Sequence, residues 1–233
     1  MRKNRRNEQV GRLRMVQVKI CGITNEEALA AALQAGADFI GLVFYPPSPR
    51  HLSLQQAARL AEMARGRARI VALVVDADDA LLEDIAGQVR PDYLQAHGHE
   101  TPKRVRAITR HTGIPVIKAF RLKGPEDLAA VDAFADDIAF PLFDAWHDPD
   151  KADLPGGMGK AFDWSWLGTW GQRRAFMLAG GLTPENVAEA ITRTGAPMVD
   201  VSSGVEKARG VKDAEKIRRF IAAAKGAAGR REA

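Results

Sequence analysis

Short apolar runs alternate with amphipathic stretches along almost the whole chain, and this alternation constrains the fold more than any other feature of the sequence. Eight runs rich in β-branched and apolar residues have the length of strands, and they lie at 16–21, 38–44, 69–75, 92–95, 114–120, 137–143, 175–179 and 198–202. Strands joined by helical stretches pair in parallel, because a parallel neighbour needs a crossover of about a dozen residues. The pattern therefore predicts a parallel sheet covered by helices, the α/β class.

Helical patterns follow seven of the eight runs, at 25–35, 53–65, 77–88, 101–111, 125–133, 183–193 and 212–224. Capping residues support several of these starts: Thr24 or Asn25 is a favoured N-cap for the first helix and Ser53 for the second, and Pro184 suits a first helical position. The link after the sixth run is rich in loop residues and leaves only 163–168 for a short helix.

Eight strand–helix units predict a closed (β/α)8 barrel, the TIM barrel, as a single catalytic domain over 15–225. The alternative is a doubly wound open sheet, which usually has fewer strands and whose nucleotide-binding form begins with a glycine-rich turn. The first turn here, Cys21-Gly22-Ile23-Thr24, lacks the G-x-G-x-x-G pattern. We therefore favour the barrel, preceded by a disordered basic leader at 1–14 and followed by a polar tail at 226–233.

The basic excess of the chain belongs to its leader. The formal net charge is +5, and residues 1–14 carry six basic residues and one acidic residue, so the remainder has equal numbers of each sign. A basic protein can bind nucleic acid through a positive face, but the domain has no overall excess from which to build one. We therefore expect no nucleic-acid partner.

A single cysteine, Cys21, excludes an internal disulfide framework and is typical of a reducing compartment. The sequence has no apolar run near the roughly 20 residues that span a bilayer, and the leader lacks the apolar stretch of a signal peptide. These observations predict a cytoplasmic protein without a membrane partner.

In a (β/α)8 barrel the active site lies at the carboxyl ends of the strands. Cys21 ends the first run and Asp144 follows the sixth, so a thiol and a carboxyl would face each other across the mouth as base and acid. The base needs a lowered pKa, for which Lys19 is a candidate partner, and the acid needs an apolar cover, for which Phe143 and Trp146 are candidates. The alternatives are a buried structural cysteine and a solvated loop aspartate.

Three glycine-bearing loops follow the last three strand-like runs. Backbone amides of glycine turns approach an anion closely, and barrels commonly bind phosphate after strands seven and eight. The expected phosphate ligands are Gly157, Gly180, Gly181, Ser203 and Gly204.

Other polar residues at the strand ends have competing interpretations. Arg50 follows a proline-rich turn that can hold a guanidinium over a carboxylate. We expect His97 to be a satisfied polar residue, and Asp200 to hold a neighbouring backbone group or lysine. The histidines do not form a convincing metal site, so neither a metal nor a cofactor is predicted.

Six motifs occur in order between residues 16 and 220. They are VKICGIT at 18–24, GADFIGLVF at 36–44 with SPR at 48–50, FD at 143–144, GMGK at 157–160 with FDW at 162–164, AGGL at 179–182, and DVSSGVE at 200–206. In these motifs the chain resembles the phosphoribosylanthranilate isomerases of tryptophan biosynthesis.

The resemblance implies a (β/α)8 barrel and a cofactor-free Amadori rearrangement. The substrate would be N-(5-phosphoribosyl)anthranilate and the product 1-(2-carboxyphenylamino)-1-deoxyribulose 5-phosphate. Asp144 would be the general acid, Cys21 the general base and Arg50 the ligand of the anthranilate carboxylate. The phosphate would lie on the glycine loops, and the enzyme would be a monomer or homodimer.

Two residues depart from the family pattern. Met158 stands where a hydroxyl residue is usual and Ala96 where leucine is common, so both bear on substrate affinity rather than on reaction type. Two other functions stay open from the residues alone. One is a phosphosugar epimerase or aldolase, which would need metal ligands or a Schiff-base lysine such as Lys19 or Lys118. The other is a non-catalytic phosphate- or RNA-binding protein that uses the leader.

Overall fold

The structure is a computed structural model that describes residues 15–134, 136–145, 163–167, 170 and 174–228. The basic leader at 1–14, the loop that carries Gly157 and Met158, and residues 229–233 of the expected tail lie outside the described residues. None of the described helices is long and apolar enough to cross a membrane.

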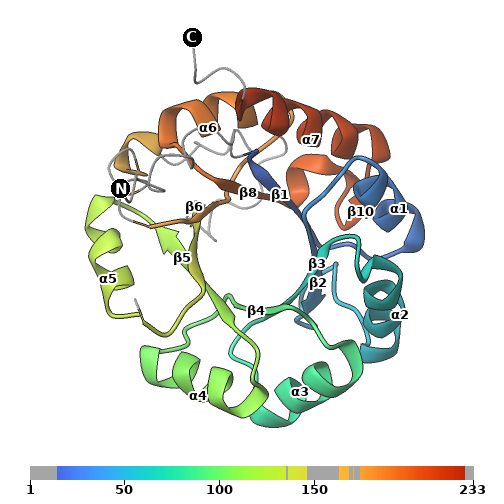
Figure 1. The fold of residues 1–233 in the computed structure, drawn as a ribbon, viewed down its shortest axis with the longest axis vertical. Coiled ribbons are helices and arrows are strands. Elements are labelled where there is room, and N and C mark those ends of the chain that lie inside the picture. The colour runs from blue at the N-terminus through green and yellow to red at the C-terminus, as the bar shows by residue number, and fades with distance from the viewer. Residues whose placement is uncertain (1–14, 135, 146–162, 168–169, 171–173, 229–233) are drawn as a thin grey trace, which may run out of the picture.

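Eight parallel strands close into a barrel in chain order, with β8 paired to β1 (Figure 1). They are β1 (Gln17–Cys21), β2 (Phe39–Phe44), β3 (Arg69–Val74), β4 (Tyr93–Ala96), β5 (Val116–Leu122), β6 (Phe140–Ala145), β7 (Met177–Leu178) and β8 (Met198–Val201). The prediction of a (β/α)8 barrel is confirmed, and closure excludes the open doubly wound sheet.

The helices form a ring outside the barrel (Figure 1). They are α1 (Glu26–Gln34), α2 (Leu54–Ala64), α3 (Asp79–Asp84), α4 (Pro102–Thr112), α5 (Ala129–Asp132), α6 (Val187–Thr194) and α7 (Ala214–Ala228). Of the two candidate caps of the first helix, Asn25 is the one used, because its side chain accepts from the Ala28 amide. The predicted cap of the second helix is confirmed, since Ser53 forms a capping box with Gln56. A short 3₁₀ helix, Trp164–Leu167, occupies the expected place after β6.

Several element boundaries differ from the predicted ones. The sixth strand runs to Ala145, so Asp144 lies within β6 rather than after it. The third helix continues as a π-helical turn at Ile85–Val89, and the fifth begins as a 3₁₀ turn at Pro125–Leu128. The helix α6 begins at Val187, so Pro184 lies in the turn before it rather than at its first position.

The segment between β8 and the last helix contains a hairpin that periodicity did not predict. Strands β9 (Glu206–Ala208) and β10 (Val211–Lys212) pair antiparallel, and Gly210 adopts a φ of 82° in the turn between them. Lys212 therefore belongs to a strand instead of starting a helix. At its other end α7 extends to Ala228, which is beyond the boundary expected at residue 225.

Alternation along the strands divides the core in two. Outward residues such as Val18 and Ile20 pack against the helices, whereas a smaller cluster fills the barrel interior. In that interior Phe39 is fully buried, and its ring lies 6.1 Å from the ring of Tyr93 and 6.5 Å from that of Phe140. The apolar interior cluster forms a solid floor beneath the mouth.

We expect Phe39→Ala to lower the free energy of unfolding by about 3–5 kcal/mol, because the barrel floor cannot collapse around the lost ring. Met63→Ala on the exposed side of α2 is the control, since Met63 is 41% exposed and its truncation should change stability by about 0.5 kcal/mol or less. Urea denaturation of both variants measures the difference. Equal effects would contradict the interior placement of Phe39.

Candidate active site

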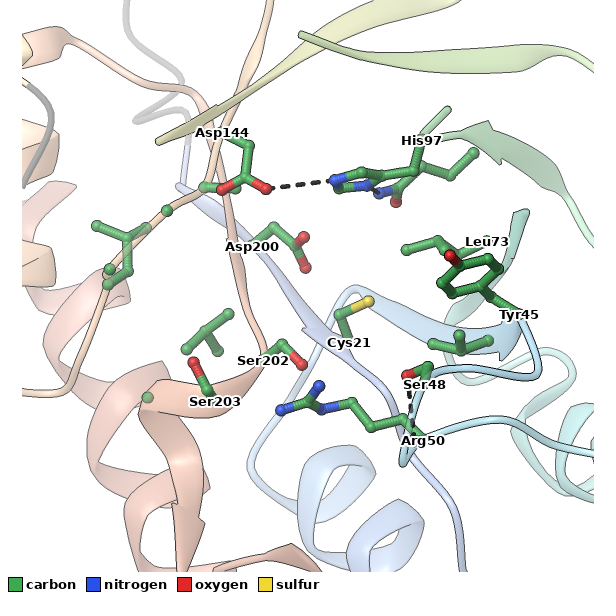
Figure 2. A pocket seen from close by; sticks show the side chains of 18 of the residues that line it. Cys21, Tyr45, Ser48, Arg50, Leu73, His97, Asp144, Asp200, Ser202 and Ser203 are labelled. Atoms are coloured by element: carbon green, nitrogen blue, oxygen red, sulfur yellow. Dashed lines mark hydrogen bonds and ion pairs between the residues drawn. The ribbon is translucent and has the colours of Figure 1, made fainter. Parts of the chain in front are cut away.

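A pocket of about 810 Å³ opens at the carboxyl ends of the barrel strands. Each strand contributes a lining residue within one position of its carboxyl end, namely Cys21, Val43, Leu73, Gln95, Arg121, Asp144, Ala179 and Asp200. The pocket therefore lies where the barrel fold predicts chemistry. Figure 2 shows Cys21 and Asp144 facing the same cavity from different strands, as the sequence predicted.

Cys21 ends β1 and is almost fully buried, with 4% of its surface exposed. A glycine on the neighbouring strand makes room for it, because a Cβ atom on Gly41 would lie 2.9 Å from the Cys21 sulfur. Gly41 is a site residue that periodicity missed, since it reads in the sequence as one more position in a strand. Cys21 and Gly41 are register partners on β1 and β2, which explains why position 41 has to lack a side chain.

Burial raises the pKa of the Cys21 thiol, and Asp200 adds to this effect, whereas Lys19 and Lys212 oppose it. The expected lowering by Lys19 is therefore present but does not prevail. Among the described residues, the requirement for a lowered pKa of Cys21 is therefore not met.

Lys19 and Asp200 form a buried ion pair directly beneath the thiol. They are register partners on β1 and β8, and the Lys19 Nζ lies 3.2 Å from Asp200 Oδ1. Burial alone would lower the pKa of Lys19, but the neighbouring Asp200 and Cys21 raise it above the ordinary value. The expectation that Asp200 holds a lysine is confirmed, and Lys19 stays charged.

Asp144 lies near the end of β6 with a partly exposed side chain. Its Oδ2 is 3.3 Å from His97 Nε2. The cover expected from Phe143 is absent, because successive side chains on a strand point to opposite faces and Phe143 packs outward against Trp170 and Phe176. Trp146, the other expected cover, lies outside the described residues.

His97 has polar partners on both ring nitrogens. Besides the contact with Asp144, its Nδ1 lies 3.0 Å from Gln95 Nε2, and Gln95 is fully buried. The expectation of a satisfied polar histidine is confirmed. Its partner on one side, however, is the carboxyl predicted to be the general acid.

Arg50 is held by a carboxylate of the protein itself. Its Nε and Nη2 donate to Oε1 and Oε2 of Glu206 at 2.7 and 2.8 Å. Glu206 also accepts from Lys212 Nζ at 2.9 Å and from the Gly210 amide at 3.0 Å. The side edge of the guanidinium is therefore occupied, and only the end edge, which carries Nη1, can meet a ligand. Arg50 lines the pocket near Ser203 (Figure 2).

Burial alone would raise the pKa of Glu206, but the hydrogen bonds from Arg50 and Lys212 hold this pKa at about 2. Sequence analysis did not single out Glu206 as a site residue, because its partners come from the loop after β2 and from the β9–β10 hairpin. Only the fold brings them together.

The two glycine turns expected to bind phosphate lie side by side at the mouth. Gly180 and Gly181 adopt left-handed φ values of 84° and 65°, which few other residues tolerate. A Cβ on Gly204 would collide with the backbone carbonyl of Leu182, so the loop after β8 packs directly on the loop after β7. Gly180, Gly181, Ser203 and Gly204 all line the pocket, whereas Gly157 lies outside the described residues.

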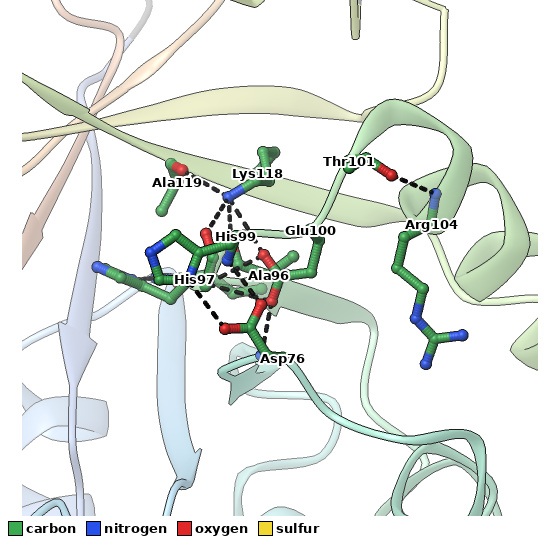
Figure 3. A network of polar contacts seen from close by, with 11 residues as sticks. Asp76, Ala96, His97, His99, Glu100, Thr101, Arg104, Lys118 and Ala119 are labelled. Atoms are coloured by element: carbon green, nitrogen blue, oxygen red, sulfur yellow. Dashed lines mark hydrogen bonds and ion pairs between the residues drawn. The ribbon is translucent and has the colours of Figure 1, made fainter.

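A second polar network anchors the loop that carries His97 (Figure 3). Lys118 on β5 donates to the carbonyls of Gly98 and Ala119, both at 2.9 Å, and lies 3.2 Å from Glu100. Glu100 in turn accepts from the Gly98 and Asp76 amides. Lys118 is thus committed to these partners and does not line the pocket, which argues against a Schiff-base role.

Two further arginines line the pocket without having been singled out from the sequence. Arg121 is paired with Asp144 in the β5–β6 register, and Arg209 lies in the turn of the unpredicted hairpin. Within the described part of the chain, no group of three or more histidine, cysteine, aspartate or glutamate side chains could hold a metal ion.

The closed barrel, with a thiol and a carboxyl sharing its mouth, places the chain among the (β/α)8-barrel enzymes. Comparison with known proteins narrows this class. A model of the N-(5'-phosphoribosyl)anthranilate (PRA) isomerase family matches residues 18–223. The chain belongs to the N-(5'-phosphoribosyl)anthranilate isomerase family, as its motifs predicted.

Similar proteins support this membership. The enzyme named N-(5'-phosphoribosyl)anthranilate isomerase from Paramagnetospirillum magneticum is 52% identical over 213 residues, covering 91% of this chain and 98% of that protein. The crystal structure of phosphoribosyl anthranilate isomerase from Thermotoga maritima is 38% identical, with a TM-score of 0.82 over 91% of this chain and 100% of that one. A phosphoribosyl anthranilate isomerase in complex with reduced 1-(o-carboxyphenylamino)-1-deoxyribulose 5-phosphate is 36% identical, with a TM-score of 0.79 over the same shares.

We expect Glu206→Gln to destabilise the protein by about 3 kcal/mol at pH 6, because the Glu206 pKa falls from 4.5 to about 2 on folding. A depressed carboxyl pKa stabilises the fold above pH 4.5 and loses its effect as the pH falls through 2. Urea denaturation should therefore show that the difference in free energy of unfolding between variant and wild type becomes smaller as the pH falls below 4.5. Glu215→Gln, on the exposed face of α7, is the control and should differ little at any pH. A difference that does not depend on pH would count against the ionised Glu206.

Proposed function

We propose that this chain isomerises N-(5'-phosphoribosyl)anthranilate in tryptophan biosynthesis, with Asp144 as general acid and Cys21 as general base. The observation that carries the proposal is the placement of these two groups on β6 and β1 around one pocket that also receives the glycine turns. Membership of the family supports the proposed identity of the substrate, and the carboxyl of Asp144 and the thiol of Cys21 support acid–base chemistry.

The first step opens the furanose ring. Asp144 donates its proton to the ring oxygen, the bond from that oxygen to C1 breaks, and the lone pair of the anthranilate nitrogen forms a C1=N double bond. The oxygen leaves as a hydroxyl group and Asp144 is left as a carboxylate. The partly exposed carboxyl at the mouth is accessible to a sugar in the pocket.

The second step moves hydrogen from C2. Cys21, as thiolate, takes the C2 proton, the electron pair forms a C1=C2 double bond, and the nitrogen recovers its lone pair. The enolamine becomes the ketone when C1 gains a proton and the C2 hydroxyl loses one. Return of the proton from Cys21 to C1 restores the base, and uptake of the hydroxyl proton restores Asp144.

The remaining pocket residues bind the substrate's two anionic groups. The end edge of Arg50 meets the anthranilate carboxylate while Glu206 fixes its side edge. The amides of Gly180, Gly181, Ser203 and Gly204 bind the phosphate, together with Gly157. Cytoplasmic location and a monomeric or homodimeric state stay predictions, the second of which light scattering can test.

We expect Cys21→Ala and Asp144→Asn each to lower kcat by about 10²–10⁴-fold, the usual contribution of one positioned proton transfer. The fluorescence decay of freshly formed phosphoribosylanthranilate measures turnover, and circular dichroism verifies the fold. Asp213→Asn, which changes a carboxylate at the start of α7, is the matched control and should keep wild-type kcat. Near-wild-type turnover by either site variant would refute the assigned role.

We expect the rate of Cys21 alkylation by iodoacetamide to rise with pH through neutrality and to level off only above the ordinary pKa range of a thiol. The reason is that burial raises the pKa of Cys21, so the thiolate needed as base becomes more abundant as pH increases. Because Cys21 is the only cysteine of the chain, the alkylation rate reports on this thiol alone. An alkylation pKa well below that of a free thiol would contradict the burial argument.

A further inference from the structure

A continuous run of polar contacts crosses the barrel mouth from β1 to β6. Lys19 Nζ lies 2.6 Å from Gln95 Oε1, Gln95 Nε2 lies 3.0 Å from His97 Nδ1, and His97 Nε2 lies 3.3 Å from Asp144 Oδ2. Lys19 and Gln95 are fully buried, so no solvent competes for these contacts at that end. The proposed mechanism gives no role to any of the first three residues.

The ammonium of Lys19 determines which way the Gln95 amide points. An ammonium has three donors and no acceptor, so the group that faces it at 2.6 Å is the amide oxygen. The ion pair with Asp200 keeps Lys19 charged and in place. The amide NH₂ of Gln95 is consequently directed at His97.

The orientation of Gln95 in turn selects one form of the His97 ring. The amide NH₂ can only donate, so Nδ1 of His97 has to accept and carries no hydrogen. A neutral imidazole with an unprotonated Nδ1 carries its hydrogen on Nε2, the atom that faces Asp144. A doubly protonated ring would set one donor against another at Nδ1.

We propose that Lys19, Gln95 and His97 form a positioning chain that holds His97 as the neutral Nε2–H tautomer, with its N–H group facing Asp144 Oδ2. The other oxygen of the carboxyl group is then left to carry the transferable proton toward the substrate. An imidazolium at the same place would hold Asp144 as a carboxylate and remove the acid. This inference rests on the proposed function of Asp144.

Other charged groups surround the positioning chain, and none of those in the described residues supplies an acceptor for Nδ1. Arg121 on β5 is the register partner of Asp144, and Cys21 and Asp200 face the pocket from β1 and β8. The carboxylates of Asp76 and Glu100, in the loops after β3 and β4, are engaged by His99 and by Lys118. Within the described residues, Gln95 is the hydrogen-bonding partner of His97 Nδ1.

The tautomer can be read directly in the free enzyme by long-range ¹H–¹⁵N correlation NMR of the ¹⁵N-labelled full chain. The spectrum of a His97→Asn variant assigns the resonances of His97 by their loss. At pH 7 we expect the ¹⁵N chemical shift of Nδ1 to be that of an unprotonated ring nitrogen and the ¹⁵N chemical shift of Nε2 to be that of a protonated one. A ring protonated on Nδ1 alone, or on both nitrogens, would overturn the proposal without any variant having to retain its fold.

The substitution Gln95→Glu tests the positioning chain, because it places a hydrogen-bond acceptor opposite Nδ1 of His97. The new carboxylate can accept from both Lys19 and His97, so we expect both ring nitrogens to be protonated at pH 7. With Asp144 then held ionised, kcat should fall about tenfold or more while KM changes much less. Gln55→Glu, the same substitution on the exposed face of α2, is the control and should leave the His97 spectrum and kcat unchanged.

The two readouts separate this inference from the proposed function. Because the tautomer is read without substrate, an enzyme with the expected spectrum but no isomerase activity would refute the function and leave the ring assignment intact. A Gln95→Glu variant with a doubly protonated His97 and an undiminished kcat would instead refute the positioning role. Loss of kcat without any change in the His97 spectrum would refute it equally.

Discussion

Pairing of β8 with β1 closes the barrel, and the buried ion pair between Lys19 and Asp200 lies at that closure. Two charges in a protein interior are stable only when their partners are well placed, and Lys19 meets this condition by also donating to Gln95. The strands that carry these three residues lie at the start, the middle and the end of the chain. Disruption of this pairing would leave an uncompensated charge directly beneath Cys21.

The polar layer at the mouth rests on an apolar floor. Phe39 and Phe140 fill the lower barrel, and above them the interior changes to lysine, glutamine and aspartate side chains. The two layers of the barrel interior therefore have different roles: the apolar cluster supplies stability, and the polar layer orients Cys21 and His97. The same burial that holds the Cys21 thiol in place also raises its pKa, so position and basicity oppose each other at this residue.

Positive potential at the pocket comes from individual residues rather than from the net charge. The basic excess lies in residues 1–14, outside the described structure, and the rest of the chain is balanced. Arg50 and Lys212 both contact Glu206, which reduces their net charge but fixes the direction of the guanidinium. An arginine held in this way loses little side-chain entropy when a ligand arrives, because the protein has already ordered it. In the proposed binding of the anthranilate carboxylate, the orientation of Arg50 therefore matters more than the number of charges.

The sequence by itself determined the order of the elements, the barrel class, the family, and the placement of Cys21 and Asp144 at the mouth. These follow from periodicity and from local motifs, because hydrophobic alternation and turn residues act over a few positions. Boundaries such as the end of β6 and the start of α6 were less predictable, and the β9–β10 hairpin was missed because it has only a few residues per strand. What the tertiary structure alone decided are the contacts between distant segments: Glu206 with Arg50, Gly41 beside Cys21, and Gln95 between Lys19 and His97. The physical reason is that hydrogen bonds and close packing depend on distances of a few ångströms, which arise only when the barrel closes.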